Sequence, residues 1–231
     1  MKTRKKRILF KPKILLIFFL IGTWMFSGKW VFAKNLECYT QFGVCDEKLV
    51  EDATWLKNTP LLFPLPQKKL QSSYQKYSQI KKINLYRRLP FTLVIRIDLR
   101  KPIGQIGAEI LGAHSVADSE GIIIGQQNNS LLPLLLMDEE YRFGEKLNDS
   151  QRLALSLLSE IGLMTDRKIL GKMEDNHLIV YLSDVTQVII NPQSLSPNWK
   201  YTLHLILDRS KIQAKVPKNI DLRFSNPILK Y

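Results

Sequence analysis

Residues 80–104 read IKKINLYRRLPFTLVIRIDLRKPIG, and this stretch carries the clearest structural pattern in the chain. Apolar and charged residues alternate from Leu93 to Arg100, which predicts a half-buried strand over 92–100. A weaker alternation over 80–88 predicts a strand before it. We therefore expect two consecutive strands, joined by the short link Leu89-Pro90-Phe91.

The segment before this pair predicts two short helices and a further strand. Asp46 can cap a first helix that ends before Pro60, and a second helix begins near Pro66. If residues 34–40 are extended, the order is strand, helix, helix, strand, strand. This order describes a compact α+β unit.

Glycines become frequent after Pro102 and the periodic segments shorten, which favours a mainly antiparallel β domain. Two helices flank it: one runs from the capping residue Ser150 to Gly162, and the last begins at Ser196. Strands are expected at 103–110, 114–117, 122–125, 178–182, 185–191 and 220–231. The expected fold class is therefore α+β in both parts of the chain.

The net charge of +13 is concentrated at the N-terminus. Seven cations and no carboxylate precede the first apolar run, whereas residues 34–231 carry 26 basic and 21 acidic side chains. The cations are Lys2, Arg4, Lys5, Lys6, Arg7, Lys11 and Lys13. This distribution is typical of a cytoplasmic flank of a membrane segment rather than of a nucleic-acid-binding surface.

The apolar run that follows has two interpretations. A transmembrane helix over 14–33 would span about 30 Å, with a cytoplasmic tail at 1–13. Alternatively, residues 14–26 are the core of a signal peptide that is cleaved after Ala33. Both interpretations place the remaining chain outside the cytoplasm.

Cys38 and Cys45 lie close together just after this segment. In an oxidising compartment they can form a disulfide that constrains a local turn, and otherwise they are two free thiols. With no histidine beside them and no second cysteine pair, a zinc site is not indicated.

Catalytic and cofactor motifs are not found in the sequence. His114, His177 and His204 are scattered without metal-ligand spacing, and no nucleophile or phosphate-binding motif occurs. We therefore expect neither an enzyme nor a cofactor, metal or small-molecule substrate. Four cations crowd one predicted strand edge, where they either contact anionic headgroups or an acidic partner or form a solvated face. They are Lys81, Lys82, Arg87 and Arg88.

The stretch over 80–104 resembles the POTRA module of the FtsQ/DivIB family of bacterial cell-division proteins. The residues that fall on the family pattern are Arg88, Pro90, Thr92, Leu93, Arg100 and Pro102. Leu99 departs from the family, which has Glu there. Further matches follow in the family's order: the turn Asp118–Gly121, the segment Leu132–Leu135 and the strand Ile220–Phe224.

The resemblance implies a transmembrane anchor over 14–33, a POTRA domain over 34–103 and a β domain over 104–231. It implies a single-pass scaffold of the division septum that links membrane proteins similar to FtsB/DivIC and FtsL. In this family the last strands of the β domain accept a strand from the FtsB/DivIC partner. The residues expected at that contact are Arg223, Phe224, Ser225, Leu229 and Tyr231, of which the last two extend the family pattern.

Two other functions remain open at this point. The first is a processed periplasmic protein whose POTRA unit serves export or outer-membrane assembly. The second is an extracytoplasmic enzyme without a recognisable motif, which would reveal itself as a deep polar pocket with converging titratable groups.

Overall fold

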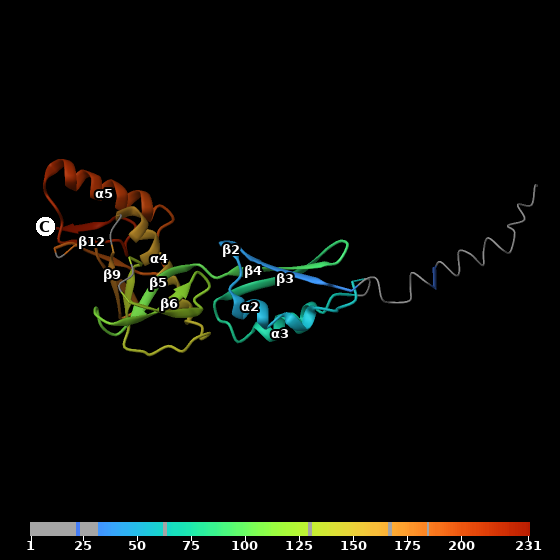
Figure 1. Cartoon of the computed structure of the whole chain (residues 1–231). Coiled ribbons are helices and arrows are strands. Elements are labelled where there is room, and N and C mark those ends of the chain that lie inside the picture. Colours follow the sequence, from blue (N-terminus) through green and yellow to red (C-terminus); the bar gives the residue numbers. More distant parts are fainter. Residues whose placement is uncertain (1–21, 24–31, 62–63, 129–130, 166–167, 184) are drawn as a thin grey trace, which may run out of the picture. The chain divides into compact units, whose positions relative to one another are not determined.

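The computed structural model describes residues 22–23, 32–61, 64–128, 131–165, 168–183 and 185–231. The chain divides into two compact units (Figure 1). The first contains the described residues up to Gln75 together with Lys82–Asp98, and the second contains Lys76–Lys81 and Leu99–Tyr231. The predicted domain boundary falls after residue 103, whereas these units divide between Asp98 and Leu99 and the second also includes Lys76–Lys81.

The first unit is a four-stranded mixed sheet with short helices (Figure 1). The strands lie in the order β2-β1-β4-β3, and β1 pairs with β4 in parallel. The elements are β1 (Asn35–Thr40), β2 (Gly43–Val44), α2 (Glu47–Glu51), η1 (Thr54–Leu56), α3 (Gln67–Tyr74), β3 (Ile80–Arg88) and β4 (Thr92–Leu99). Apart from the short β2, this is the strand, helix, helix, strand, strand order expected from the sequence.

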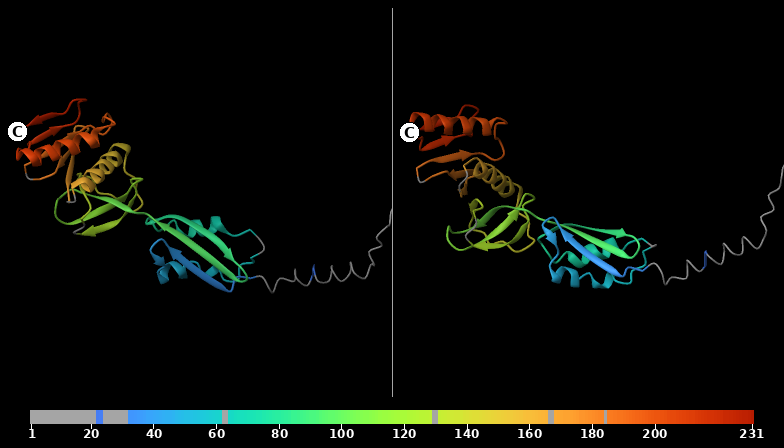
Figure 2. Two further views of the ribbon diagram at one scale, coloured as in Figure 1. Left: turned by 90° about the horizontal axis from the view of Figure 1, so that it is seen from above. Right: turned by 45° about the horizontal axis from the view of Figure 1, so that its top comes forward.

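Alternating side chains of β4 form the core of this unit together with the two helices. Leu93, Ile95 and Ile97 are fully buried, and Leu70 and Tyr74 of α3 are buried with them. The helices lie on one face of the sheet, as Figure 2 shows. Burial of every second β4 residue is the physical basis of the alternation seen in the sequence.

The segment at which the described chain enters the first unit is part of its fold. Phe32 forms an isolated bridge with Pro60, and Ala33 is 1% exposed. The Ala33 N–H donates to Thr59 O at 3.0 Å, and Ala33 O accepts from Asn58 N at 2.9 Å. The predicted membrane span over 14–33 is therefore too long by at least two residues, because Phe32 and Ala33 belong to the folded unit. Apart from residues 22–23, the rest of the predicted span lies outside the described residues. Within the described part of the chain, no helix is both long and apolar enough to cross a bilayer.

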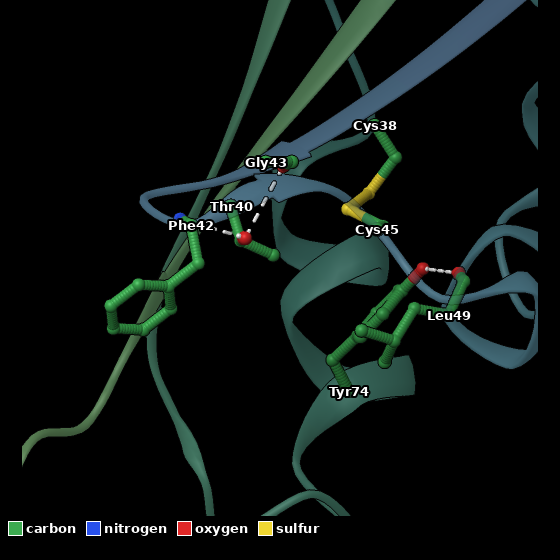
Figure 3. The surroundings of a disulfide bond; sticks show 7 residues. All are labelled: Cys38, Thr40, Phe42, Gly43, Cys45, Leu49 and Tyr74. Carbon is green, nitrogen blue, oxygen red and sulfur yellow. Dashed lines mark hydrogen bonds between the residues drawn. A yellow bond between two sulfur atoms is a disulfide. The ribbon is translucent and has the colours of Figure 1, made fainter.

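A disulfide joins Cys38 of β1 to Cys45, which follows β2 (Figure 3). The turn between these strands is stabilised by Thr40, whose Oγ1 donates to Gly43 O and accepts from Phe42 N. Gly43 has a φ of 138°, a conformation that favours glycine. On the helical side, the Tyr74 hydroxyl donates to Leu49 O and ties α3 to α2.

The second unit is built on a nine-stranded mixed sheet. Five of its strand pairings are antiparallel and three are parallel, so the expectation of a mainly antiparallel domain holds only in part. The strand order is β13-β12-β11-β10-β9-β8-β5-β6-β7. The strands are β5 (Pro102–Gly107), β6 (Ala113–Asp118), β7 (Ile123–Asn128), β8 (Leu134–Leu136), β9 (Leu170–Glu174), β10 (His177–Tyr181), β11 (Gln187–Ile190), β12 (Asn219–Asp221) and β13 (Ile228–Lys230).

Two helices, α4 (Asp149–Thr165) and α5 (Trp199–Gln213), contribute their apolar sides to the core of the second unit. Two glycines allow α4 to approach the sheet closely. A Cβ at Gly104 would lie 2.5 Å from Leu155 Cδ1, and a Cβ at Gly171 would lie 2.9 Å from Leu158 Cδ1. Both leucines are fully buried, so glycine is needed at these positions to let the helix pack.

The prediction of one terminal strand over 220–231 is wrong. The structure has two short strands, β12 and β13, which pair antiparallel as a hairpin. Residues 222–227 form the connection, and its last residue, Pro227, precedes β13. Asn226 and Pro227 are turn-forming residues, and they interrupt the run that the apolar pattern alone would continue.

Candidate partner-binding edge

The two sheets have four outer edges, formed by β2, β3, β7 and β13. An outer edge can accept a strand from another protein only where its main-chain N–H and C=O groups are unpaired. The edges therefore differ according to which of their main-chain groups already have hydrogen-bond partners. Strand β2 offers only two residues, which leaves β3, β7 and β13.

The edge of β3 is closed in its middle by a side chain. Gln67 Nε2 donates to Ile83 O at 2.6 Å, and Gln67 Oε1 accepts from Leu85 N at 3.0 Å. The side-chain amide thus takes the place that a peptide group of an added strand would occupy. This is a protective device of the kind that natural sheets use against edge pairing.

The edge of β7 is also partly covered. Main-chain hydrogen bonds of 2.9 Å join Ile123 to Gly144 and to Glu145. An added strand would have to displace these two bonds, so β7 is a poor acceptor at its N-terminal end.

The edge of β13 is open. Leu222 N donates to Ile189 O, so the main-chain groups of Leu222 face β11. Main-chain groups alternate sides along a strand, so those of Ile220, two residues earlier, also face β11. Leu229 lies opposite Ile220, so its N–H and C=O point away from β12. In the part of the chain that the structure describes, no strand lies on that side.

A small cavity lies between β13 and α5, with a volume of about 170 Å³. Its lining residues are Leu205, Ile206, Arg209, Ser210, Gln213, Leu229 and Tyr231. Lys215 Nζ lies 4.4 Å from the centre of the Tyr231 ring, which is half exposed. A strand added to β13 would direct alternate side chains to this side of the sheet, where the cavity has an apolar floor and a cation at Arg209.

The connection between β12 and β13 is organised by an ion pair. Arg223 Nη2 lies 2.6 Å from Asp221 Oδ2, and Arg223 Nε donates to Asp221 Oδ1 at 2.9 Å. These hydrogen bonds lower the pKa of Asp221 against the opposing effect of burial. The Phe224 ring lies 5.8 Å from the Arg223 guanidinium and is 53% exposed, so Phe224 is not a core residue.

The structure therefore separates the five predicted partner-binding residues into two groups. Leu229 lies on the open edge strand β13 and Tyr231 just after it, whereas both were expected on one strand with Arg223, Phe224 and Ser225. Arg223, Phe224 and Ser225 lie in the connection and not on the same strand. Sequence reasoning missed Arg209 and Gln213, because helical periodicity pointed only to the buried side of α5.

The residues on which the resemblance to a POTRA module rests lie in and around β3, β4 and β5. Thr92 and Leu93 are buried at the start of β4, Pro90 lies in the β3–β4 turn, and Arg88 forms an ion pair with Glu37. Arg100 lies two residues before Pro102, the first residue of β5.

Arg100 meets the turn that begins at Asp118. Arg100 Nη1 lies 2.5 Å from Asp118 Oδ2 and 2.8 Å from Glu120 Oε2, and Lys81 Nζ lies 2.7 Å from Glu120 Oε1. Hydrogen bonds from Lys81 and Arg100 lower the pKa of Glu120 to about 2. Burial alone would lower the pKa of Arg100, but its bonds to Glu120 and Asp118 outweigh this effect and raise it. Two separate motifs of the sequence therefore form one ion-pair cluster.

The histidines are not grouped. His114 is buried, with Nε2 2.9 Å from Glu109 O. His204 pairs with Asp208 on the exposed side of α5. His177 begins β10. No group of three or more potential metal ligands was found among the described residues.

Comparison with known proteins added no relative. A scan against protein-family models and a search of curated proteins each gave no match to this chain.

Proposed function

We propose that this protein is a single-pass membrane scaffold of the bacterial division machinery, of the FtsQ/DivIB type. It binds an FtsB/DivIC-like partner by accepting a strand at the open edge of β13, and an FtsL-like protein joins through that partner. The support is the ordered set of sequence motifs together with the open edge.

The observation that carries this proposal is the difference between the edges. The β3 edge is closed by Gln67 and the β7 edge is partly covered, whereas the N–H and C=O of Leu229 on β13 point away from β12 and face no other strand of the described chain. Each main-chain hydrogen bond to an added strand contributes a net of about 0.5–1.5 kcal/mol. A short strand thus gives weak pairing by itself.

Anchoring in the membrane compensates for weak pairing. Two proteins held in the same membrane meet at a raised effective concentration, so a few main-chain bonds and one filled cavity suffice for association. The cavity between β13 and α5 supplies selectivity, because it accepts an apolar side chain close to the Arg209 cation.

Co-purification tests this function. The full chain is co-expressed with the FtsB/DivIC-like protein of the same organism, and the partner is quantified after affinity purification from membranes. Removal of residues 228–231 is expected to abolish recovery of the partner, while Phe42→Ala, at an exposed turn of the first unit, leaves it unchanged. Equal recovery with and without residues 228–231 would exclude β13 as the binding edge.

The membrane anchor is tested separately by the mass of the protein in the membrane fraction. An anchored chain keeps its full 26.8 kDa, whereas processing after Ala33 shortens it by 33 residues and releases it from the membrane. A released, shortened product would favour the periplasmic alternative.

A further inference from the structure

An exposed apolar turn lies at the end of the first unit where the chain enters. Leu89, at the β3–β4 turn, is 74% exposed. Lys34 N and Asn35 N donate to Phe91 O at 2.8 and 3.1 Å, so this turn lies directly beside the start of β1. Figure 2 shows the β3–β4 turn and the start of β1 at the same end of the unit.

Cations surround this turn. Lys34, Arg87 and Arg88 are exposed, and Lys34 Nζ lies 4.9 Å from the centre of the Phe91 ring. Lys57 is exposed in the neighbouring segment, next to Asn58, whose N–H donates to Ala33 O. We call the Leu89 turn with these four cations the Leu89 tip.

Charge is unevenly distributed in this part of the chain. Residues 53–97 contain nine cations and no carboxylate. Of the acidic residues in the first unit, Glu37 alone lies near the tip, where it pairs with Arg88. The others lie in or beside α2 or near the C-terminal end of β4, namely Asp46, Glu47, Glu51, Asp52 and Asp98.

We propose that the Leu89 tip docks on the anionic phospholipid headgroups of the membrane that anchors the protein. This proposal rests on the proposed function, because it requires the membrane anchor. It adds a second membrane contact, made by the folded domain itself.

The reach of the chain supports this contact. Phe32 and Ala33 already belong to the folded unit, so the anchor ends before Phe32, and Lys34, two residues further on, is hydrogen-bonded to Phe91 O. Two residues span at most about 7 Å, so Leu89 lies within that distance of Phe91. The headgroup layer on each side of a bilayer is about 5–8 Å thick, which brings Leu89 within reach of it.

The chemistry of the Leu89 tip fits an anionic interface. Long basic side chains place their charge among headgroups while an apolar residue enters the acyl boundary. Each cation close to an anionic surface strengthens binding by roughly fivefold, and the effect decreases within a Debye length of about 10 Å at 0.1 M salt. An acidic protein partner is a different hypothesis, and the test below distinguishes it.

Site-specific photo-crosslinking of the full chain in lipid nanodiscs tests this proposal. Benzoylphenylalanine is placed at Leu89 or, as the matched control, at Phe42. Both residues are 74% exposed in turns of the same sheet, but Phe42 follows β1 and so lies at its opposite end. The nanodiscs contain phosphatidylglycerol unless stated, and adducts with phospholipid of either headgroup are quantified by mass spectrometry.

Lipid adducts at position 89 are expected to exceed those at position 42 by at least about tenfold. They should fall by at least about fivefold in nanodiscs of phosphatidylcholine alone or at 1 M salt, where the Debye length is about 3 Å. Equal adduct yields at the two positions would overturn the proposal. An adduct yield at position 89 that does not depend on lipid charge or salt concentration would also overturn it. So would an adduct at 89 that forms in native membranes with an acidic protein and not with lipid.

A charge variant completes the test. Lys57→Gln with Arg87→Gln should lower the yield at position 89 by roughly 25-fold, at about fivefold for each of the two cations. Lys48→Gln with Lys82→Gln removes the same net charge from the first unit away from the tip and should leave the yield unchanged. If the two double variants behave alike, the tip cations do not direct docking and the proposal fails.

Failure of the anchor gives a different result from failure of the docking. A chain without a membrane anchor does not insert into nanodiscs of any composition, and this result rejects the proposed function together with the docking. A chain that inserts normally but gives no lipid adduct at position 89 rejects the docking alone.

Discussion

Leu229→Pro isolates the contribution of the β13 main chain to partner binding. The Leu229 N–H points to the outer edge, so proline removes a donor that is not needed for the hairpin with β12. Proline is tolerated on an edge strand where its nitrogen faces outward. The hairpin is therefore expected to remain while its outer edge loses a donor.

The expected magnitude follows from the hydrogen bond that is lost. An incoming carbonyl that is buried against a proline has no donor, which costs about 1–3 kcal/mol. This corresponds to a dissociation constant raised by roughly 5- to 150-fold. The half-buried Leu229 side chain also contributes, and Leu229→Ala measures that contribution alone because it keeps the N–H.

The assay is a binding titration of each full-length variant in nanodiscs against the purified FtsB/DivIC-like partner. Leu229→Pro is expected to bind at least about fivefold more weakly than Leu229→Ala. Thermal unfolding of both variants verifies that the second unit stays folded. Equal affinities for the two folded variants would show that the partner does not pair with the main chain of β13, and the strand-addition mechanism would be refuted.

Three further predictions concern the scaffold. Gln67→Ala unpairs two β3 main-chain groups, so it should lower the free energy of unfolding by about 1–3 kcal/mol and cause self-association in sedimentation velocity, whereas exposed Gln71→Ala should do neither. The lowered pKa of Glu120 means that its ion pairs stabilise the fold above about pH 4.5 and that this stability is lost as the pH falls toward about 2. Glu120→Gln should therefore flatten the pH dependence of urea unfolding in that range, by less than about 1 kcal/mol because the side chain is half exposed. Gly104→Ala places a Cβ 2.5 Å from a buried leucine of α4 and should cost about 1–3 kcal/mol in thermal unfolding, while Gly125→Ala, with open space around it, should cost little.

The first unit could be predicted almost completely from the sequence. Its strands have strong alternation, and β3 and β4 begin and end close to the expected residues. The strands of the second unit were harder to predict. For example, β9 reads LGKME and has no strand pattern of its own. It is a strand because β8 and β10 supply partners on both sides, which is a tertiary effect that local propensity does not contain.

The candidate site shows the same limit. The extension of the family pattern led to Leu229 and Tyr231, and Leu229 lies on the edge strand β13 with Tyr231 just after it. That extension ran through Asn226-Pro227, although these residues already signal a turn. Gln67 closes the β3 edge through two hydrogen bonds to residues that are 16 and 18 positions further along the chain. The sequence pattern does not reveal such contacts.

The order of the strands in the second sheet also bears on which copies of the chain could offer the outer edge. From β9 to β13 each strand lies beside the one that precedes it along the chain, and among the described strands β13 is held in the sheet through β12 alone. A chain truncated before Ile228 would therefore have β12 as its outer strand and would lack the main-chain groups of Leu229. Strand pairing at β13 would then discriminate between intact and truncated copies.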